Sequence, residues 1–293
     1  MADNVNAPPR EQALLVGERR ALVGILSQPR AEASPDPLRP VVVLLNAGIV
    51  HRVGPNRMHV ELARHLASCG FTVLRFDLAG VGDSPSRSDG LAPLQASLAD
   101  VREVLDWLEA SRGARRFVLG GLCSGADHAL LHAKDDPRVA GLVLLDPSLP
   151  RTRGFYYRHW ARRLVSLRTW LSIASGRHPT WRRVLRILAR VKPAEAVAAT
   201  TPDLESPEVR AALENAYRGA LSHGTRLLAV FAGTGGREYR INYREQMLDA
   251  FPSIEFGDAL QLEYVQDADH TFAAERHRSQ LIGSISDWMR HFC

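Results

Sequence analysis

The sequence contains only three cysteines among its 293 residues, Cys69, Cys123 and Cys293. Three cysteines so far apart do not form a disulfide framework, and no spacing of His, Cys and Asp matches a metal template. The glycine-rich run at 233–236 (GTGG) lacks both the Lys-Ser/Thr of a P-loop and the G-x-G-x-x-G frame of a dinucleotide site. We therefore expect neither a metal nor another cofactor.

Long apolar runs are missing as well. No stretch approaches the roughly 20 uncharged residues of a membrane span, and the first dozen residues (MADNVNAPPREQ) are polar, unlike a signal peptide. Hydrophobic residues make up 45% of the chain and charged residues 24%, which excludes an intrinsically disordered protein. These features predict a soluble globular protein of the cytoplasm.

Acidic residues are absent from one segment. Between Arg151 and Lys192 there are eleven Arg, one Lys and no Asp or Glu, and the rest of the chain is net acidic. The same segment holds Trp160, Trp170 and Trp181. Two interpretations remain open: solvated helices whose Arg stems cover apolar surface, or a surface for an anionic partner. The segment also suits membrane-surface docking or a homodimer contact, whereas no base-reading motif suggests nucleic acid.

Short apolar runs alternate with helical spacings along most of the chain. Residues 13–16 and 21–26 predict an antiparallel hairpin. Buried strands are predicted at 40–45, 72–76, 116–119, 139–145, 226–231 and 260–265, and helices at 57–68, 98–111, 125–134, 243–250 and 275–290. This alternation favours right-handed βαβ crossovers. We therefore expect a mostly parallel eight-stranded sheet with helices on both faces.

The alternation breaks between about residues 150 and 224, where no strand is recognisable. This segment is predicted to be a helical, Arg-rich cap inserted after the sixth strand. The core then consists of residues 1–149 and 225–293.

Gly121-Leu122-Cys123-Ser124-Gly125 lies directly between a predicted strand and a predicted helix. That context is required of a G-x-nucleophile-x-G elbow, in which small neighbours permit a tight, strained turn. The central residue is Cys123, and the N-terminus of a helix favours its thiolate form. Two alternatives remain. Ser124 could be the nucleophile, although the motif does not centre on it, or Cys123 could be a buried cysteine with a structural role alone.

The chain resembles the α/β-hydrolase superfamily over nearly its whole length. The resemblance is carried by LLNAGIVHRVGP, RFDLAGVGDS, GLCSGA and DADH. It looks most similar to the capped branch of serine-aminopeptidase-like and exosortase-associated hydrolases. In having Cys at the elbow, it resembles dienelactone hydrolases and some biosynthetic thioesterases. The resemblance implies the α/β-hydrolase fold and a general base in the loop after the last strand. His270 occupies that loop, and imidazole suits proton transfer near neutrality.

The position of the catalytic acid, which would partner His270, departs from the pattern of the superfamily. Its members usually have this Asp after the seventh strand. The loop at 231–238 contains no Asp. Asp146, at the end of the sixth strand, is the preferred substitute because a strand end is a rigid mount, and Glu238 is the alternative. A Cys–His dyad without an acid is a third possibility, since a thiol is more easily ionised than a hydroxyl.

An oxyanion hole needs two donors. We expect the backbone N–H of Ser124 to be one and an N–H at Gly48 or Ile49 to be the other. His51 and Arg52, further along the same loop, are predicted to bind substrate, although Arg52 could instead hold the loop by salt bridges.

These residues predict an acyl hydrolase or acyltransferase that acts on a thioester or activated ester through an acyl-Cys123 intermediate. The expected partner is a small acyl substrate, linked to pantetheine or CoA or carried by an acidic carrier protein. Two other functions remain open. One is a catalytically silent binding protein with this fold, and the other is a hydrolase of lactones or carbon–carbon bonds.

Overall fold

The computed structural model describes residues 9–17, 21–29, 39–158, 204, 206–233 and 242–292. Its eight strands are β1 (Arg10–Val16), β2 (Leu22–Gln28), β3 (Val41–Leu45), β4 (Val73–Phe76), β5 (Phe117–Leu122), β6 (Val139–Leu145), β7 (Arg226–Ala232) and β8 (Leu260–Val265). All eight predicted strands are confirmed. The hairpin begins earlier than expected because β1 is an edge strand whose first residues are polar and largely exposed.

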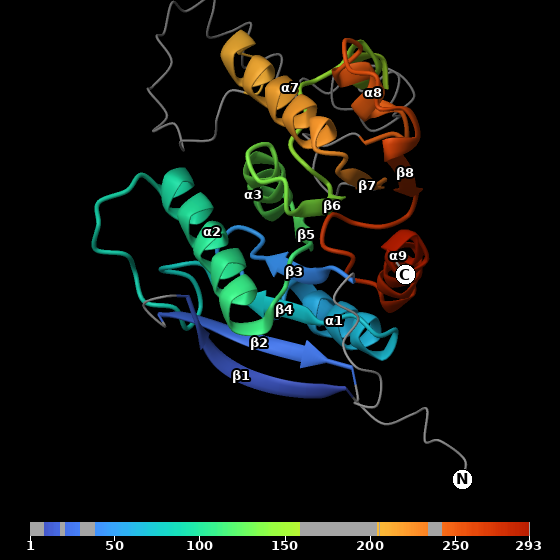
Figure 1. Ribbon diagram of the computed structural model, residues 1–293. Helices are drawn as coiled ribbons and strands as arrows, with labels where there is room; N and C mark the ends of the chain where they lie inside the picture. The colour runs from blue at the N-terminus through green and yellow to red at the C-terminus, as the bar shows by residue number, and fades with distance from the viewer. Residues whose placement is uncertain are drawn as a thin grey trace, which may run out of the picture.

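The strands form one sheet in the order β1-β2-β4-β3-β5-β6-β7-β8 (Figure 1). The pairs β1–β2 and β2–β4 are antiparallel, and every pair from β4 onward is parallel. All carboxyl ends of the parallel strands therefore lie at one edge of the sheet, which is where open α/β sheets bind ligands.

The helices with assigned bounds are α1 (Met58–Ser68), α2 (Pro93–Arg112), α3 (Ser124–Ala133), α7 (Pro207–Ser222), α8 (Gln246–Ala250) and α9 (Glu275–Met289). Helix α2 begins a turn earlier than its apolar spacing predicts. Its first residue is Pro93, whose fixed φ suits the first helical position, and Leu94 in that turn is exposed. Within the described ranges, no helix is long and apolar enough to cross a bilayer.

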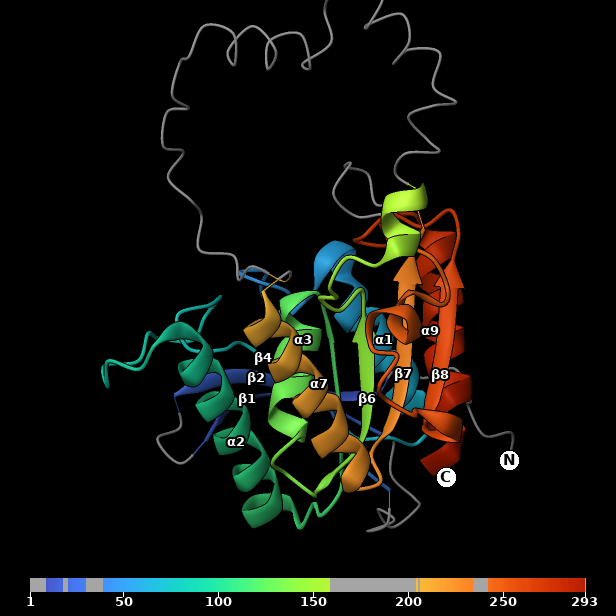
Figure 2. The ribbon, with the colours of Figure 1, turned by 90° about the horizontal axis from the view of Figure 1, so that it is seen from above.

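The two faces of the sheet carry separate hydrophobic cores. Successive strand residues point to opposite faces, so Val43 and Leu45 pack with α2, α3 and α7, whereas Val42 and Leu44 pack with α1 and α9. Figure 2 shows these two groups of helices on opposite sides of the sheet. Because both faces are covered, the parallel strands read as continuous apolar runs.

The segment predicted to be a cap is described only at its two ends. Residues 153–158 are helical, and residues 159–203 lie outside the described part of the chain. At the other end, α7 buries Leu213, Ala216 and Tyr217 in the core and packs beside α3. The predicted boundary at 224 therefore falls after a core helix. The sequence assigns this helix to the cap because no strand separates it from the Arg-rich segment.

Candidate active site

The predicted site residues gather at the carboxyl edge of the sheet. Cys123 follows β5, Asp146 follows β6, and the loop containing Gly48 follows β3. His270 lies in the loop between β8 and α9. Four segments distant in sequence thus meet because their strands are parallel neighbours, or nearly so, in one sheet.

Cys123 occupies the turn from β5 into α3 with φ 57° and ψ −121°. Positive φ is uncommon for a residue with a side chain and is the strained geometry of a nucleophile elbow. The Cys123 N–H still donates to the Leu145 carbonyl at 2.9 Å, and its carbonyl accepts from the Asp127 N–H in the first turn of α3. The half-buried Cys123 side chain is therefore held between a strand end and a helix N-terminus.

The two glycines of the elbow are required by contact. A Cβ at Gly121 would lie 2.5 Å from the carbonyl carbon of Gly125. A Cβ at Gly125 would lie 2.6 Å from the carbonyl oxygen of Asn46. Both clashes are with backbone, which cannot move aside without displacing β3 or α3.

Asp146 and His270 form a hydrogen-bonded pair. His270 Nδ1 lies 2.7 Å from Asp146 Oδ2, and the Asp146 side chain is fully buried. The other carboxylate oxygen, Oδ1, accepts hydrogen bonds from the Ala232 N–H at 2.8 Å and from Asn242 Nδ2 at 2.9 Å. A carboxylate fixed in this way orients the imidazole and stabilises its protonated form. Asp146, the preferred acid, thus lies in direct contact with His270.

Asn242 is a site residue that the sequence did not reveal. Its side-chain amide donates to both Asp146 Oδ1 and the Ala232 carbonyl, each at 2.9 Å. Asn242 lies in the connection after β7, where members of the superfamily usually have their catalytic Asp. A search of the sequence for acidic residues does not find it, because an amide is uncharged. Asn242 therefore fixes the orientation of the Asp146 carboxylate, which in turn contacts His270.

The His270 loop is stabilised from within. Asp269 accepts hydrogen bonds from the Ala273 N–H at 2.7 Å and from Thr271 Oγ1 at 3.0 Å. Asp269 therefore shapes the turn that leads into α9.

The loop after β3 approaches the elbow through Gly48. The Gly48 N–H donates to the Ser124 hydroxyl oxygen at 2.8 Å. The same loop turns through a hydrogen bond from the Val50 N–H to the Ala47 carbonyl, which leaves the Ile49 side chain 91% exposed. The structure thus brings Ser124, Gly48 and Ile49 to one place.

Asn46 and Asp77 anchor this loop from below. Asn46 donates to Asp77 and to the Val50 carbonyl, and its side-chain oxygen accepts from the Leu78 N–H. Asp77 is fully buried and also accepts from the backbone N–H of Arg52 at 2.6 Å. Asp77 therefore has a structural role in this loop.

Arg52 has the loop-holding arrangement considered above. Its guanidinium pairs with Asp77 and lies 2.8 Å from Asp83, and only 12% of its side chain is exposed. His51 Nε2 lies 2.7 Å from the same guanidinium and 3.3 Å from Asp83. Contact of His51 or Arg52 with substrate stays a prediction.

His51, Asp77 and Asp83 bring their ligand atoms within 4.8 Å of one another. This set does not fit a metal ion, because the Arg52 guanidinium already lies between the two carboxylates and supplies the positive charge there. Glu238, the alternative acid, lies outside the described residues.

Comparisons with known proteins agree with this architecture. Residues 39–215 match the model of the serine aminopeptidase family S33. No curated protein sequence is similar enough to match. The similar solved structures described below are 13–17% identical to this chain and show the fold alone.

Three solved structures are similar to this chain over nearly its whole length. An esterase from Pyrococcus furiosus, Pf2001, has a TM-score of 0.59 and 13% identity, covering 99% of this chain and 95% of its own. Est1E from Butyrivibrio proteoclasticus has a TM-score of 0.59 and 14% identity, covering 96% and 98%. XC6422 from Xanthomonas campestris, described as an α/β serine hydrolase without a lid, has a TM-score of 0.54 and 17% identity, covering 97% and 94%.

These structures confirm the α/β-hydrolase fold that the sequence motifs implied. The family is named after serine, whereas the centre of this elbow is Cys123. The family model spans more than half of the sequence, from within the connection before β3 to the middle of α7. The chain therefore belongs to the serine aminopeptidase S33 family of α/β hydrolases.

Proposed function

We propose that the protein is an acyl hydrolase or acyltransferase that works through an acyl-Cys123 intermediate, with His270 as general base and Asp146 as its acid partner. The substrate is a thioester or an activated ester. The observation that carries the proposal is the 2.7 Å contact between His270 Nδ1 and the buried Asp146 carboxylate, at the same edge of the sheet as the Cys123 elbow.

The steps follow from these positions. With Nδ1 held by Asp146, His270 Nε2 takes the proton of the Cys123 thiol, and the sulfur forms a bond to the acyl carbon. The carbonyl oxygen becomes an oxyanion, which accepts from the backbone N–H of Ser124 and from the loop after β3. Collapse breaks the bond to the leaving group, which receives the proton from His270. Water, an alcohol or an amine then takes the acyl group and restores the thiol.

The chemistry of sulfur supports thioesters and activated esters. A thiolate exchanges readily with them, whereas an amide needs a well-protonated leaving group. The placement of a buried Asp146–His270 pair at the edge of the sheet that carries the Cys123 elbow supports an enzyme over a catalytically silent binding protein, because buried pairs of titratable groups cluster at functional sites.

The test is to incubate the protein with a panel of acyl-pantetheine thioesters, activated esters and lactones, and to record intact mass and the modified peptide. Wild type, Cys123→Ala and His270→Ala are compared. We expect an acyl adduct on Cys123 that is absent in Cys123→Ala and forms more slowly in His270→Ala.

An adduct on Ser124 instead would overturn the choice of nucleophile. Turnover of lactones without any thioester adduct would favour the lactone hydrolase. No adduct and no turnover, together with a Cys123 thiol inert to alkylation, would favour the binding protein.

A further inference from the structure

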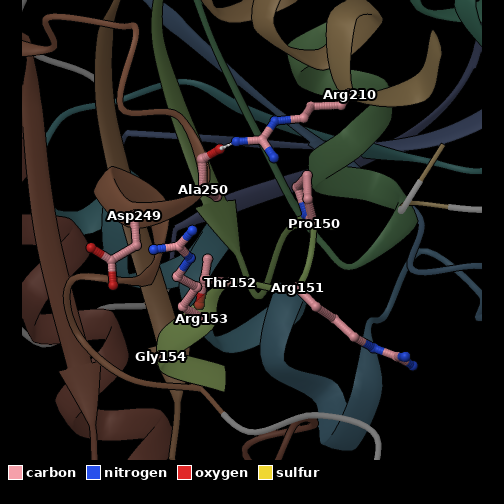
Figure 3. Close-up of a pocket in the computed structure, with 8 residues that line it drawn as sticks. All are labelled: Pro150, Arg151, Thr152, Arg153, Gly154, Arg210, Asp249 and Ala250. Atoms are coloured by element: carbon pink, nitrogen blue, oxygen red, sulfur yellow. Dashed lines mark hydrogen bonds between the residues drawn. The ribbon is translucent and has the colours of Figure 1, made fainter. Parts of the chain in front are cut away.

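A pocket of about 360 Å³ lies at the start of the long connection after β6. Its size falls in the range of small-molecule sites, roughly 300–1,000 Å³. Its lining includes Pro150, Thr152, Arg153, Arg210, Asp249 and Ala250. Figure 3 shows that three chain segments contribute: the connection after β6, α7, and α8.

The lining is dominated by positive charge. Three arginines and one acidic residue, Asp249, line the pocket. In Figure 3 the guanidinium groups of Arg153 and Arg210 are directed toward the side where Asp249 and Ala250 lie, whereas that of Arg151 is directed away. Two cations from different segments thus converge on one space.

The two converging arginines differ in how they are held. Arg210 Nη2 donates to the Ala250 carbonyl at 2.7 Å, which fixes its guanidinium at the pocket wall. Arg153 makes no ion pair with any acid in the described part of the chain, although Asp249 lines the same pocket. The Asp249 carboxylate instead accepts the Tyr243 hydroxyl at 2.6 Å. Among the described residues, the pocket therefore presents one cation held by Glu214 and the Ala250 carbonyl, and a second, Arg153, that is in no ion pair.

The pocket is joined to the catalytic residues by two short stretches of chain. Pro150 is four residues beyond Asp146, a span of at most about 14 Å. On the other side, Asn242 donates to Asp146, and the next residue, Tyr243, hydrogen-bonds Thr152 and Asp249 of the pocket. The pocket and the Asp146–His270 pair are thus connected through the neighbouring residues Asn242 and Tyr243.

We propose that this pocket binds a phosphate group carried by the substrate, with Arg153 and Arg210 as its ligands. This inference rests on the proposed acyl transfer and narrows its substrate to a phosphate-bearing thioester. Phosphate has three acceptor oxygens and can engage two guanidinium groups from different directions, which a flat carboxylate does less well. The phosphate remains unchanged in the reaction and positions the thioester.

The direct test measures binding and needs no catalysis. Inorganic phosphate and phosphopantetheine are titrated calorimetrically into wild type, Arg153→Ala and Arg210→Ala. We expect each substitution to weaken binding about tenfold, because each removes charge-assisted hydrogen bonds. Pantetheine without phosphate should bind more weakly than phosphopantetheine to the wild type. The difference should shrink as salt is raised.

Arg218→Ala is the matched control for Arg210→Ala. Arg218 lies on the same helix, and its Nη2 donates to the Ser253 carbonyl at 2.6 Å, the same type of bond, outside the pocket. It should leave phosphate affinity unchanged. Equal phosphate affinity in wild type and in both pocket variants, or no binding at millimolar concentration, would overturn the proposal.

A kinetic test separates this proposal from the proposed function. The same acyl group is offered as a phosphopantetheine and as a pantetheine thioester, and acylation of Cys123 is followed. We expect the phosphate to lower KM about tenfold in wild type and in Arg218→Ala, but not in Arg153→Ala. Phosphate binding without any acylation would contradict the acyl-transfer function alone. Acylation with no preference for phosphate would contradict the pocket alone.

Discussion

The Gly48 N–H donates a hydrogen bond to the Ser124 hydroxyl oxygen at 2.8 Å. The sequence predicts this N–H as a donor of the oxyanion hole, and here it is already bonded to a side chain of the elbow. In the proposed reaction, the substrate oxygen must displace this hydroxyl to reach Gly48. Otherwise it accepts from the next amide, that of Ile49. Ser124 therefore has opposite effects through its two groups: its backbone N–H is an expected donor and its hydroxyl is a competitor.

We predict that Ser124→Ala accelerates acylation of Cys123 by up to about tenfold, because removal of an internal hydrogen bond worth roughly 0.5–1.5 kcal/mol frees the Gly48 N–H. The measurement is the single-turnover rate of adduct formation by mass spectrometry. A loss of more than about 100-fold would instead identify the Ser124 hydroxyl as a participant in the reaction and restore the rival nucleophile.

Asp146→Asn should slow acylation about 100-fold or more, because an amide can present its NH₂ to His270 and favour the wrong tautomer. The chain offers a matched control in a second Asp–His pair, Asp136 and His132, with 3.2 Å between Oδ2 and Nε2. Asp136→Asn should lower the free energy of unfolding by about 1–3 kcal/mol through its lost bonds to Arg138. It should leave acylation unchanged. Equal rates in wild type and Asp146→Asn would remove Asp146 from the mechanism.

Gly121→Ala should strongly destabilise the protein and abolish acylation, since its Cβ would lie 2.5 Å from the Gly125 carbonyl carbon. The control is Gly283→Ala, inside α9, where a Cβ meets no atom within 4 Å. That change should raise the free energy of unfolding by about 0.5–1 kcal/mol, because alanine is the better helix former. Chemical denaturation of both variants checks the pair. A fully active Gly121→Ala protein would mean that the elbow is less tightly closed than its geometry indicates.

Stability should fall as pH falls from about 6.5 to about 4, and His59 should contribute to this. Burial, with a contribution from the Arg75 charge, lowers the pKa of His59 from 6.5 to about 4. Between these values the unfolded chain binds a proton at His59 that the folded chain does not, so acid favours unfolding. The effect amounts to at most about 3 kcal/mol at pH 4.

His59→Leu should flatten this part of the pH profile, measured by urea denaturation across pH 4–7. The imidazole nitrogens of His59 have no hydrogen-bond partner in the described structure, so the apolar replacement loses no such bond. An unchanged slope between pH 6.5 and 4 would show that other groups cause the acid sensitivity.

The sequence predicts most of the strands and helices because a parallel sheet is buried on both faces. Strands covered on both faces read as continuous apolar runs, as at 139–145, where the predicted and observed bounds coincide. The edge strand β1 and the exposed first turn of α2 were placed less well, because exposed positions follow no apolar pattern. Helix α7 was assigned to the cap for a similar reason: its buried positions are sparse and follow the Arg-rich segment.

By itself, the sequence determined the elbow, because two glycines around one residue between a strand and a helix leave few other conformations. It also determined that His270 lies after the last strand. It left the acid open between Asp146 and Glu238, since which carboxylate reaches an imidazole depends on packing between β6 and the loop after β8. Only the tertiary structure joined Asp146 to His270, brought Asn242 onto that carboxylate, and set Ser124 against Gly48. These contacts join residues 76 to 124 positions apart, and only the order of strands in the folded sheet creates them.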